Sequence, residues 1–266
     1  MLNTTAIGAL AGAVVGLVGV LVGQYLAQRR QNQALRHTDE LEEQRANKDA
    51  LLKYLEVVGQ LLTDPSRDDS LLNPIIRAQT LTLLEALSPG HKRILLQFLY
   101  ELHLIAPEKP GLSLQEANLE TANLERANLA EAYLESAYLE RVNLAEANLE
   151  RANLTEANLV DADLRKAYLE EANLERANLA GADLVDANLA KAKLEEANLV
   201  AADLRRANLA GAKLKQADLS GAYLQETTEE SLTQTQINEA IGNDATKLPD
   251  HLQRPAHWSK GETGKS

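Results

Sequence analysis

The stretch Ala117-Asn118-Leu119-Glu120-Thr121 begins a run of five-residue units, and Ala222-Tyr223-Leu224-Gln225-Glu226 ends it. The run holds 22 units without an insertion. Leu occupies the third position of every unit, and Ala occupies the first position in all but the unit of Val142. The second position is Asn, Asp, Tyr or Lys. A period this strict predicts one short structural element that is repeated along the chain.

A period of five residues excludes both a straight α-helix and a straight β-strand. On an α-helix each unit advances by about 140°, so the Leu side chains would wind around the whole surface. On a strand, Ala and Leu of one unit share a face, but the odd period sends the next pair to the opposite face. The chain therefore has to turn after each unit, with Ala and Leu inside a coil and the other three positions outside.

Charges at the fifth position predict how many units complete one coil. Residues stacked on adjacent coils lie ~4.8 Å apart, where like charges destabilise a sheet. With four units per coil, one column alternates in sign without a break, through Arg126, Glu146, Lys166, Asp186, Arg206 and Glu226. All 11 charged pairs at this spacing are opposite in sign, whereas the charged pairs five units apart are like in sign. Four units per coil are therefore predicted, which gives about five and a half coils over ~26 Å.

The repeated Ala-Asn-Leu units resemble the pentapeptide-repeat family, and the resemblance covers residues 117–226. It implies a mainly β solenoid, a right-handed quadrilateral β-helix. Leu119 through Leu224 would be its central inward residues, and Ala117 through Ala222 their small inward partners. The second position departs from the usual Asn or Asp at six places, which are Tyr133, Tyr138, Tyr168, Lys193, Lys213 and Tyr223. The role of that position is left open by these departures.

A membrane helix is predicted before the repeat, because residues 6–23 carry no charged or strongly polar side chain. Between 18 and 22 residues span roughly 27–33 Å, which matches the hydrocarbon core of a bilayer. A cleaved secretory signal is the competing interpretation, but no Lys or Arg precedes the segment. Arg29, Arg30 and Arg36 follow it, so the positive-inside rule places the bulk of the chain in the cytoplasm. A single-pass protein of a bacterial inner membrane or thylakoid, in contact with lipid through residues 6–27, is expected.

Glycines of the predicted membrane helix form one stripe. At about 100° per residue, five of them fall within ~80° of the helix surface, namely Gly8, Gly12, Gly16, Gly19 and Gly23. Such a groove lets a second helix approach closely in lipid. Pairing of two copies is the simplest expectation, and a different partner helix fits the same chemistry.

Four domains are predicted: an anchor over 1–30, an α-helical stalk and N-terminal cap region over 31–111, the β-helix over 112–226, and a C-terminal cap helix and tail over 227–266. Apolar residues at helical spacing predict three amphipathic helices in the second of them. The ends of a solenoid expose unpaired backbone and need covers. The helix around Ile94 is expected to cover the first end. Thr233 and Gln236 fit the capping box of a helix at the other end, Gly242 is expected to stop it, and Trp258 is expected to pack back on that end.

Composition excludes several kinds of site. The chain has no Cys, so thiolate nucleophiles and Cys-based metal sites are absent. Its five His residues are scattered, and no phosphate-binding, dinucleotide-binding or nucleophile motif occurs. The net charge of −12 disfavours nucleic acid as a partner. A non-catalytic protein without a cofactor or metal is therefore expected.

Three functions remain open. The first is a membrane-tethered scaffold that binds an unidentified protein through its outer faces, with an interaction surface of Tyr133, Tyr138, Tyr168, Lys193 and Lys213. The second is implied by the resemblance, because some members of the family mimic DNA and regulate type II topoisomerases. Against it, the repeat interleaves 12 basic with 20 acidic residues. The third is a structural spacer.

Overall fold

The computed structural model describes residues 39–61, 69–101, 104–105 and 111–258. The chain divides into two compact units, Met1–Leu52 and Lys53–Ser266, and the repeat lies in the second. The predicted membrane helix over residues 6–27 and its five glycines lie outside the described residues. No helix within the described ranges is both long and apolar enough to cross a bilayer.

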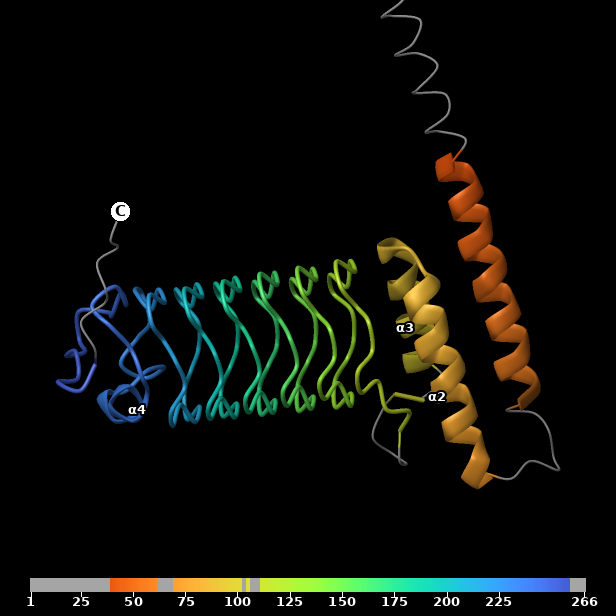
Figure 1. Ribbon diagram of the computed structural model, residues 1–266. Coiled ribbons are helices and arrows are strands. Elements are labelled where there is room, and N and C mark those ends of the chain that lie inside the picture. The colour runs from red at the N-terminus through yellow and green to blue at the C-terminus, as the bar shows by residue number, and fades with distance from the viewer. Residues whose placement is uncertain (1–38, 62–68, 102–103, 106–110, 259–266) are drawn as a thin grey trace, which may run out of the picture. The chain divides into compact units, whose positions relative to one another are not determined.

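Residues 117–226 wind into stacked coils of four units each, as predicted (Figure 1). Each second-position residue forms a parallel bridge with its counterpart four units later, from Asn118 with Tyr138 to Asp203 with Tyr223. In each rung, a third-position N–H donates to the second-position carbonyl of the next coil, as Leu119 does to Tyr138 at 2.8 Å. The return bond runs from Tyr138 N–H to Ala117 O at 3.0 Å. Four units per coil therefore satisfy the backbone between coils.

A tight turn closes every unit. The first-position N–H donates to the third-position carbonyl of the unit before, as Ala122 does to Leu119 at 3.1 Å. Every fifth-position residue from Thr121 to Glu226 has φ between 52° and 70°, although only three of them are glycine. Positive φ at the third residue of a turn is the signature of type II. At the fifth positions that are not glycine, this strained backbone persists because the hydrogen bond of the turn and the hydrogen bonds to the neighbouring coils hold it in place.

The core is the continuous stack of first- and third-position side chains. Leu119, Leu169 and Leu224 are fully buried, as are nearly all the other repeat Leu and Ala side chains. Val142, the exception at the first position, is equally buried. The inward assignment made from the period is thus confirmed.

Two helices cover the N-terminal end of the stack, α2 over Asp69–Ala86 and α3 over Pro89–Glu101 (Figure 1). Residues 39–61 are also helical, so the three predicted amphipathic helices are present. Lys92 of α3 donates to Asn118 O at 2.9 Å, the acceptor that a preceding coil would otherwise engage. Arg77 of α2 likewise donates to Ser113 O at 3.2 Å and Gln115 O at 2.9 Å. Burial lowers the pKa of Lys92, and the nearby carboxylate of Glu85 opposes this shift.

The C-terminal end is closed by a helix and two short strand pairings. Helix α4 covers Gln234–Glu239, and Thr233 and Gln236 form the predicted capping box. Gln236 also donates to Leu209 O and Ala212 O, at 2.8 and 2.9 Å. Ile241 pairs with Asp218, and the next bridge, formed by Lys247, completes the closure.

The predicted role of Gly242 as the helix stop is wrong. The C-cap of α4 is Ala240, in extended conformation, two residues earlier. A Cβ on Gly242 would lie 2.6 Å from the ring of Trp258, so this position has to be small for the ring to pack. Trp258 is 7% exposed and donates from Nε1 to Ala240 O at 3.0 Å, which confirms that the tail packs back.

Candidate functional site

The outward second-position residues form four columns, one on each face of the coil. We name each face by its first residue. The Asn118 face holds Asn118, Tyr138, Asn158, Asn178, Asn198 and Asp218; the Asn123 face holds Asn123, Asn143, Asp163, Asp183, Asp203 and Tyr223. The Asn128 face holds Asn128, Asn148, Tyr168, Asn188 and Asn208; the Tyr133 face holds Tyr133, Asn153, Asn173, Lys193 and Lys213.

Asn and Asp at the second position hold the turn that follows them. In all sixteen such units, the side-chain oxygen accepts from the fourth-position N–H, as Asn148 does from Glu150 at 3.0 Å. This is the local side-chain to backbone bond that makes Asn and Asp frequent in turns. A Tyr or Lys side chain cannot make it. The six departures therefore give up a local stabilising bond.

A long polar side chain at the fourth position accompanies these departures. Five of the six Tyr or Lys units carry Glu or Gln there, and the sixth carries Lys215. After Tyr133, Glu135 accepts from Asn153 Nδ2 of the next coil at 2.5 Å, and Glu140 accepts from Asn158 in the same way after Tyr138. The other carboxylate oxygen of each Glu is buried without a hydrogen-bond partner. The pairing of Tyr with Glu two residues later was a readable signal in the sequence.

The predicted interaction residues lie on three different faces. Tyr133, Lys193 and Lys213 share the Tyr133 face, while Tyr138 and Tyr168 lie on the Asn118 and Asn128 faces. The exposed fractions of the three Tyr side chains are 38%, 47% and 50%. The fold thus joins three of the five residues in one column and presents the other two separately.

Ion pairs join fifth-position residues of successive coils. These residues lie at the turns between two faces, which we call the corners of the coil. Eight of the eleven predicted neighbours contact each other directly at 2.7–3.7 Å. Arg206 contacts both Asp186 and Glu226, at 2.7 and 3.1 Å. On the Asn123 face, Arg165 bridges Asp163 at 2.5 Å and Asp183 at 3.6 Å, so the one run of stacked Asp residues also has cations beside it.

These pairs predict a loss of stability in acid. The hydrogen bond from Arg126 lowers the pKa of Glu146, and those from Arg151 and Lys191 lower that of Glu171. A carboxylate with a lowered pKa in the folded state contributes stability above its unfolded pKa and loses it as pH falls through the folded value. Melting temperatures followed by circular dichroism should therefore fall between neutral pH and about pH 3, and less so at high salt, because the pairs are exposed. A melting temperature that stays constant over this range would contradict the prediction.

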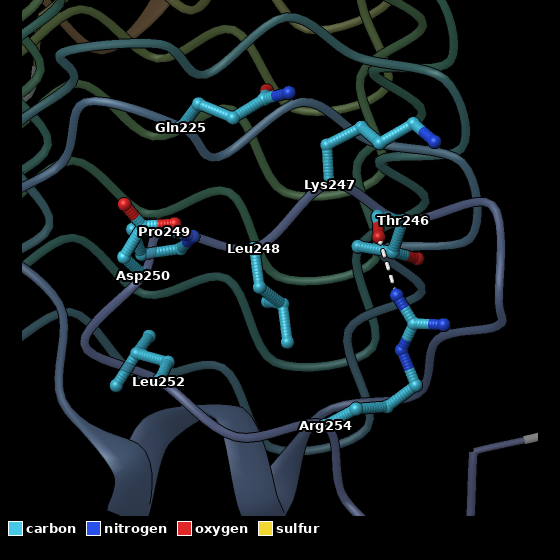
Figure 2. Close-up of a pocket in the computed structure, with 8 residues that line it drawn as sticks. All are labelled: Gln225, Thr246, Lys247, Leu248, Pro249, Asp250, Leu252 and Arg254. Carbon is cyan, nitrogen blue, oxygen red and sulfur yellow. Dashed lines mark hydrogen bonds between the residues drawn. The ribbon is translucent and has the colours of Figure 1, made fainter.

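No cluster of three or more His, Asp or Glu residues suited to a metal occurs in the part of the chain that the structure describes. A pocket of about 550 Å³ lies beside the C-terminal closure (Figure 2). Its apolar lining includes Leu248 and Leu252, and Arg254 reaches across to donate to Thr246 O at 2.9 Å. Arg254 also donates to Asp244 O at 3.1 Å. The Arg254 guanidinium thus binds backbone carbonyls at this end of the solenoid, as the side chains of Arg77 and Lys92 do at the other end.

Sequence comparison identifies the repeat. A family model described as pentapeptide repeats matches eight copies over residues 111–144, 132–170, 167–206 and 202–228. No curated protein matches the chain.

Solved structures of repeat proteins also match. HetL, described as a pentapeptide repeat protein involved in heterocyst differentiation regulation from the cyanobacterium Nostoc sp. strain PCC 7120, is 31% identical; the match covers 56% of this chain and 78% of HetL, with a TM-score of 0.36. Rfr23, from the cyanobacterium Cyanothece 51142, is 28% identical over 49% of this chain and 87% of its own, with a TM-score of 0.25. QnrB1, a plasmid-mediated fluoroquinolone resistance protein, is 16% identical over 53% and 78%, with a TM-score of 0.27.

Proposed function

We propose that this chain acts as a membrane-tethered, non-catalytic scaffold. The chain belongs to the pentapeptide-repeat family and has the right-handed β-helix of that family. In this proposal the outer faces of the coil bind another protein, the segment over residues 6–27 holds the chain on a bilayer, and the repeat lies in the cytoplasm. Rigid repeat rods present extended surfaces suited to such binding.

The observation that carries the proposal is the exchange of a turn-holding Asn for an exposed Tyr. At Tyr138 and Tyr168 the unit lacks the bond that Asn would make, yet the ring stays about half exposed instead of entering the core. Exposed Tyr side chains are enriched at interfaces, because they bury a large area with little loss of rotamer freedom. Residues that lower local stability and remain on the surface are best explained by a binding role.

Replacement of Tyr168 by Asn is expected to stabilise the fold. The new Asn would accept from the N–H of Glu170, and its column would be uniformly Asn, as where Asn208 donates to Asn188 at 3.0 Å. One added bond is worth about 1 kcal/mol, so the melting temperature should rise. A melting temperature below that of the wild type would show that the ring stabilises the fold and has no need of a partner.

The binding role is tested by affinity capture of the full-length tagged chain from gently solubilised membranes, with mass spectrometry of what is retained. A partner held by the wild type should be lost from the triple variant Tyr133→Asn, Tyr138→Asn and Tyr168→Asn. The matched control is Asn148→Ala, which removes a turn bond on the Asn128 face but keeps every Tyr. A partner retained equally by the triple variant would overturn the role of the three Tyr residues, and recovery of no partner at all would overturn the scaffold and favour a spacer.

The alternative is a DNA mimic that regulates a type II topoisomerase. A DNA-like surface needs a continuous anionic stripe, whereas Arg and Lys interrupt the described acidic columns, as Arg176 does between Glu156 and Glu196 at 3.6 and 3.0 Å. Recovery of gyrase or topoisomerase IV in the capture experiment, with inhibition of supercoiling by the purified chain, would replace the scaffold with this function.

A further inference from the structure

The Tyr133 face differs from the others in that its two ends carry opposite charge. Its first coil has an acidic end, which we define as Glu131, Tyr133 and Glu135. Its last coils have a lysine end, which comprises Lys191, Lys193, Lys213 and Lys215. The Tyr133 face is also the one face of the described repeat with Lys at its second positions: the Asn128 face has no charge at these positions, and the Asn118 and Asn123 faces have only Asp.

The charges of whole coils follow the same direction. Residues 117–136 hold four acids and one base, a net charge of −3. Residues 197–216 hold one acid, Asp203, and four bases, a net charge of +3, and form the one positive coil among the five complete coils of the repeat. Two copies side by side with opposite directions would therefore bring unlike charges together at both ends.

Three of the four Lys residues of the lysine end are only loosely neutralised within the chain, whereas Lys191 pairs with Glu171 at 3.2 Å. Lys193 and Lys213 are bridge partners, so two like charges are stacked where a sheet disfavours them. Their ion pairs are long, 4.0 Å from Lys193 to Glu175 and 3.7 Å from Lys213 to Glu195, against 2.7 Å for Arg206 with Asp186 on a corner. Lys215 has no ion pair within 4 Å among the described residues.

The acidic end is similarly incomplete. Glu135 has one carboxylate oxygen on the amide of Asn153 and the other buried without a hydrogen-bond partner. No cation among the described residues pairs with Glu135, so its negative charge is not neutralised within the chain. Glu131 contacts Arg151 at 3.7 Å, the longest of the corner pairs. Tyr133 offers a ring face, which attracts a Lys ammonium.

We propose that the Tyr133 face binds the same face of a second copy, with the two rods antiparallel. The acidic end of each copy then meets the lysine end of the other, and Asn173, midway between Tyr133 and Lys213, lies at the two-fold axis. Such an interface is closed, because each patch is complementary to itself. The interface is also small, because it extends only about 19 Å along the rod axis from Tyr133 to Lys213. The dimer is therefore weak, sensitive to salt and dependent on tethering of both copies to one membrane.

This inference deepens the proposed function for one face, by naming a second copy as its partner, and it needs no partner for Tyr138 or Tyr168. It differs from pairing through the glycine stripe, which involves only the predicted membrane helix. Loss of the foreign partner in the capture experiment and loss of the paired copies in the experiment below are therefore separate results.

Thiol cross-linking in the full-length chain tests the arrangement, because the sequence has no Cys. Ser136→Cys in one tagged copy and Gln216→Cys in a differently tagged copy place thiols at the corner beside Glu135 and Lys215. In membranes that contain both copies, a short bismaleimide should link the two cysteines and give a product that carries both tags. The control pair, Thr121→Cys with Ala201→Cys, lies on the same two coils at a corner that does not border the Tyr133 face, and should cross-link about tenfold less.

Charge reversal supplies the second arm. Lys213→Glu with Lys215→Glu in both copies should reduce the mixed-tag product to the level of the control pair, as should Glu131→Lys with Glu135→Lys. One copy with reversed lysines and one with reversed acids should recover it, because both ends are then complementary again. Equal cross-linking of the two cysteine pairs, or a product unaffected by reversal, would overturn the proposal.

Discussion

Replacement of Leu169 by Asp is expected to unfold the coils around it. Leu169 is fully buried, its N–H donates to Asn188 O at 2.7 Å, and its carbonyl accepts the turn bond from Ala172 at 3.1 Å. A carboxylate at this point would have apolar neighbours on every side, so the change should cost several kcal/mol. Because each coil contacts only its neighbours, melting by circular dichroism should show lower cooperativity as well as a lower midpoint.

The adjacent position provides the control. Glu170 points outward and contacts Lys191 at 3.6 Å, a solvent-screened pair worth little. Glu170→Gln should leave the melting midpoint nearly unchanged, and Leu169→Met should cost less than about 1.5 kcal/mol, because it preserves volume. Equal tolerance of Leu169→Asp and Glu170→Gln would refute the inward assignment of the third position.

Gly242→Ala is expected to release Trp258 from the C-terminal cap. The added Cβ would lie 2.6–2.7 Å from three atoms of the indole ring, so either the ring or the backbone must move. Displacement removes the bond from Nε1 to Ala240 O and part of the burial of the ring, which should cost about 2–3 kcal/mol.

Fluorescence measures this change directly, because Trp258 is the one Trp of the chain. Emission should shift to longer wavelength in Gly242→Ala under native conditions. Gly90→Ala is the matched control, since a Cβ there meets nothing within 4 Å and Ala is the better helix former. An unshifted emission spectrum with wild-type stability would show that the cap tolerates a larger residue at position 242.

Residues 117–226 show that a strictly repeated sequence predicts both the register and the interior of the coil. The register of four units per coil followed from the signs of residues such as Arg126 and Glu146, because like charges cannot stack at the spacing of a sheet. The bridges and ion pairs confirm it. The interior followed from the odd period, which leaves one arrangement that buries both Ala and Leu.

The contacts that close the ends of the solenoid were harder to predict from the sequence. Covers were expected, and a helix near Ile94 was placed at the first end, but the bonds from Arg77 and Lys92 to the open carbonyls were not foreseen. Such contacts join residues far apart in the chain and leave no periodic trace. The same reason explains Gly242, which looks like a helix stop in sequence and is set instead by the aromatic ring of Trp258.

The sequence by itself determined the coil, its inward residues and the alternation of charge along its corners, because each depends on a short period that repeats 22 times. The same register of four units per coil also fixed which outward residues share a column, so Tyr133, Lys193 and Lys213 fall on one face from the sequence, as the bridges confirm. Tertiary structure decided how the ends of the solenoid are closed: Arg77 and Lys92 bind open carbonyls at the first end, and the ring of Trp258 requires a small residue at Gly242 at the other. These contacts join residues that are far apart in the chain and belong to no repeated unit, so no local pattern specifies them.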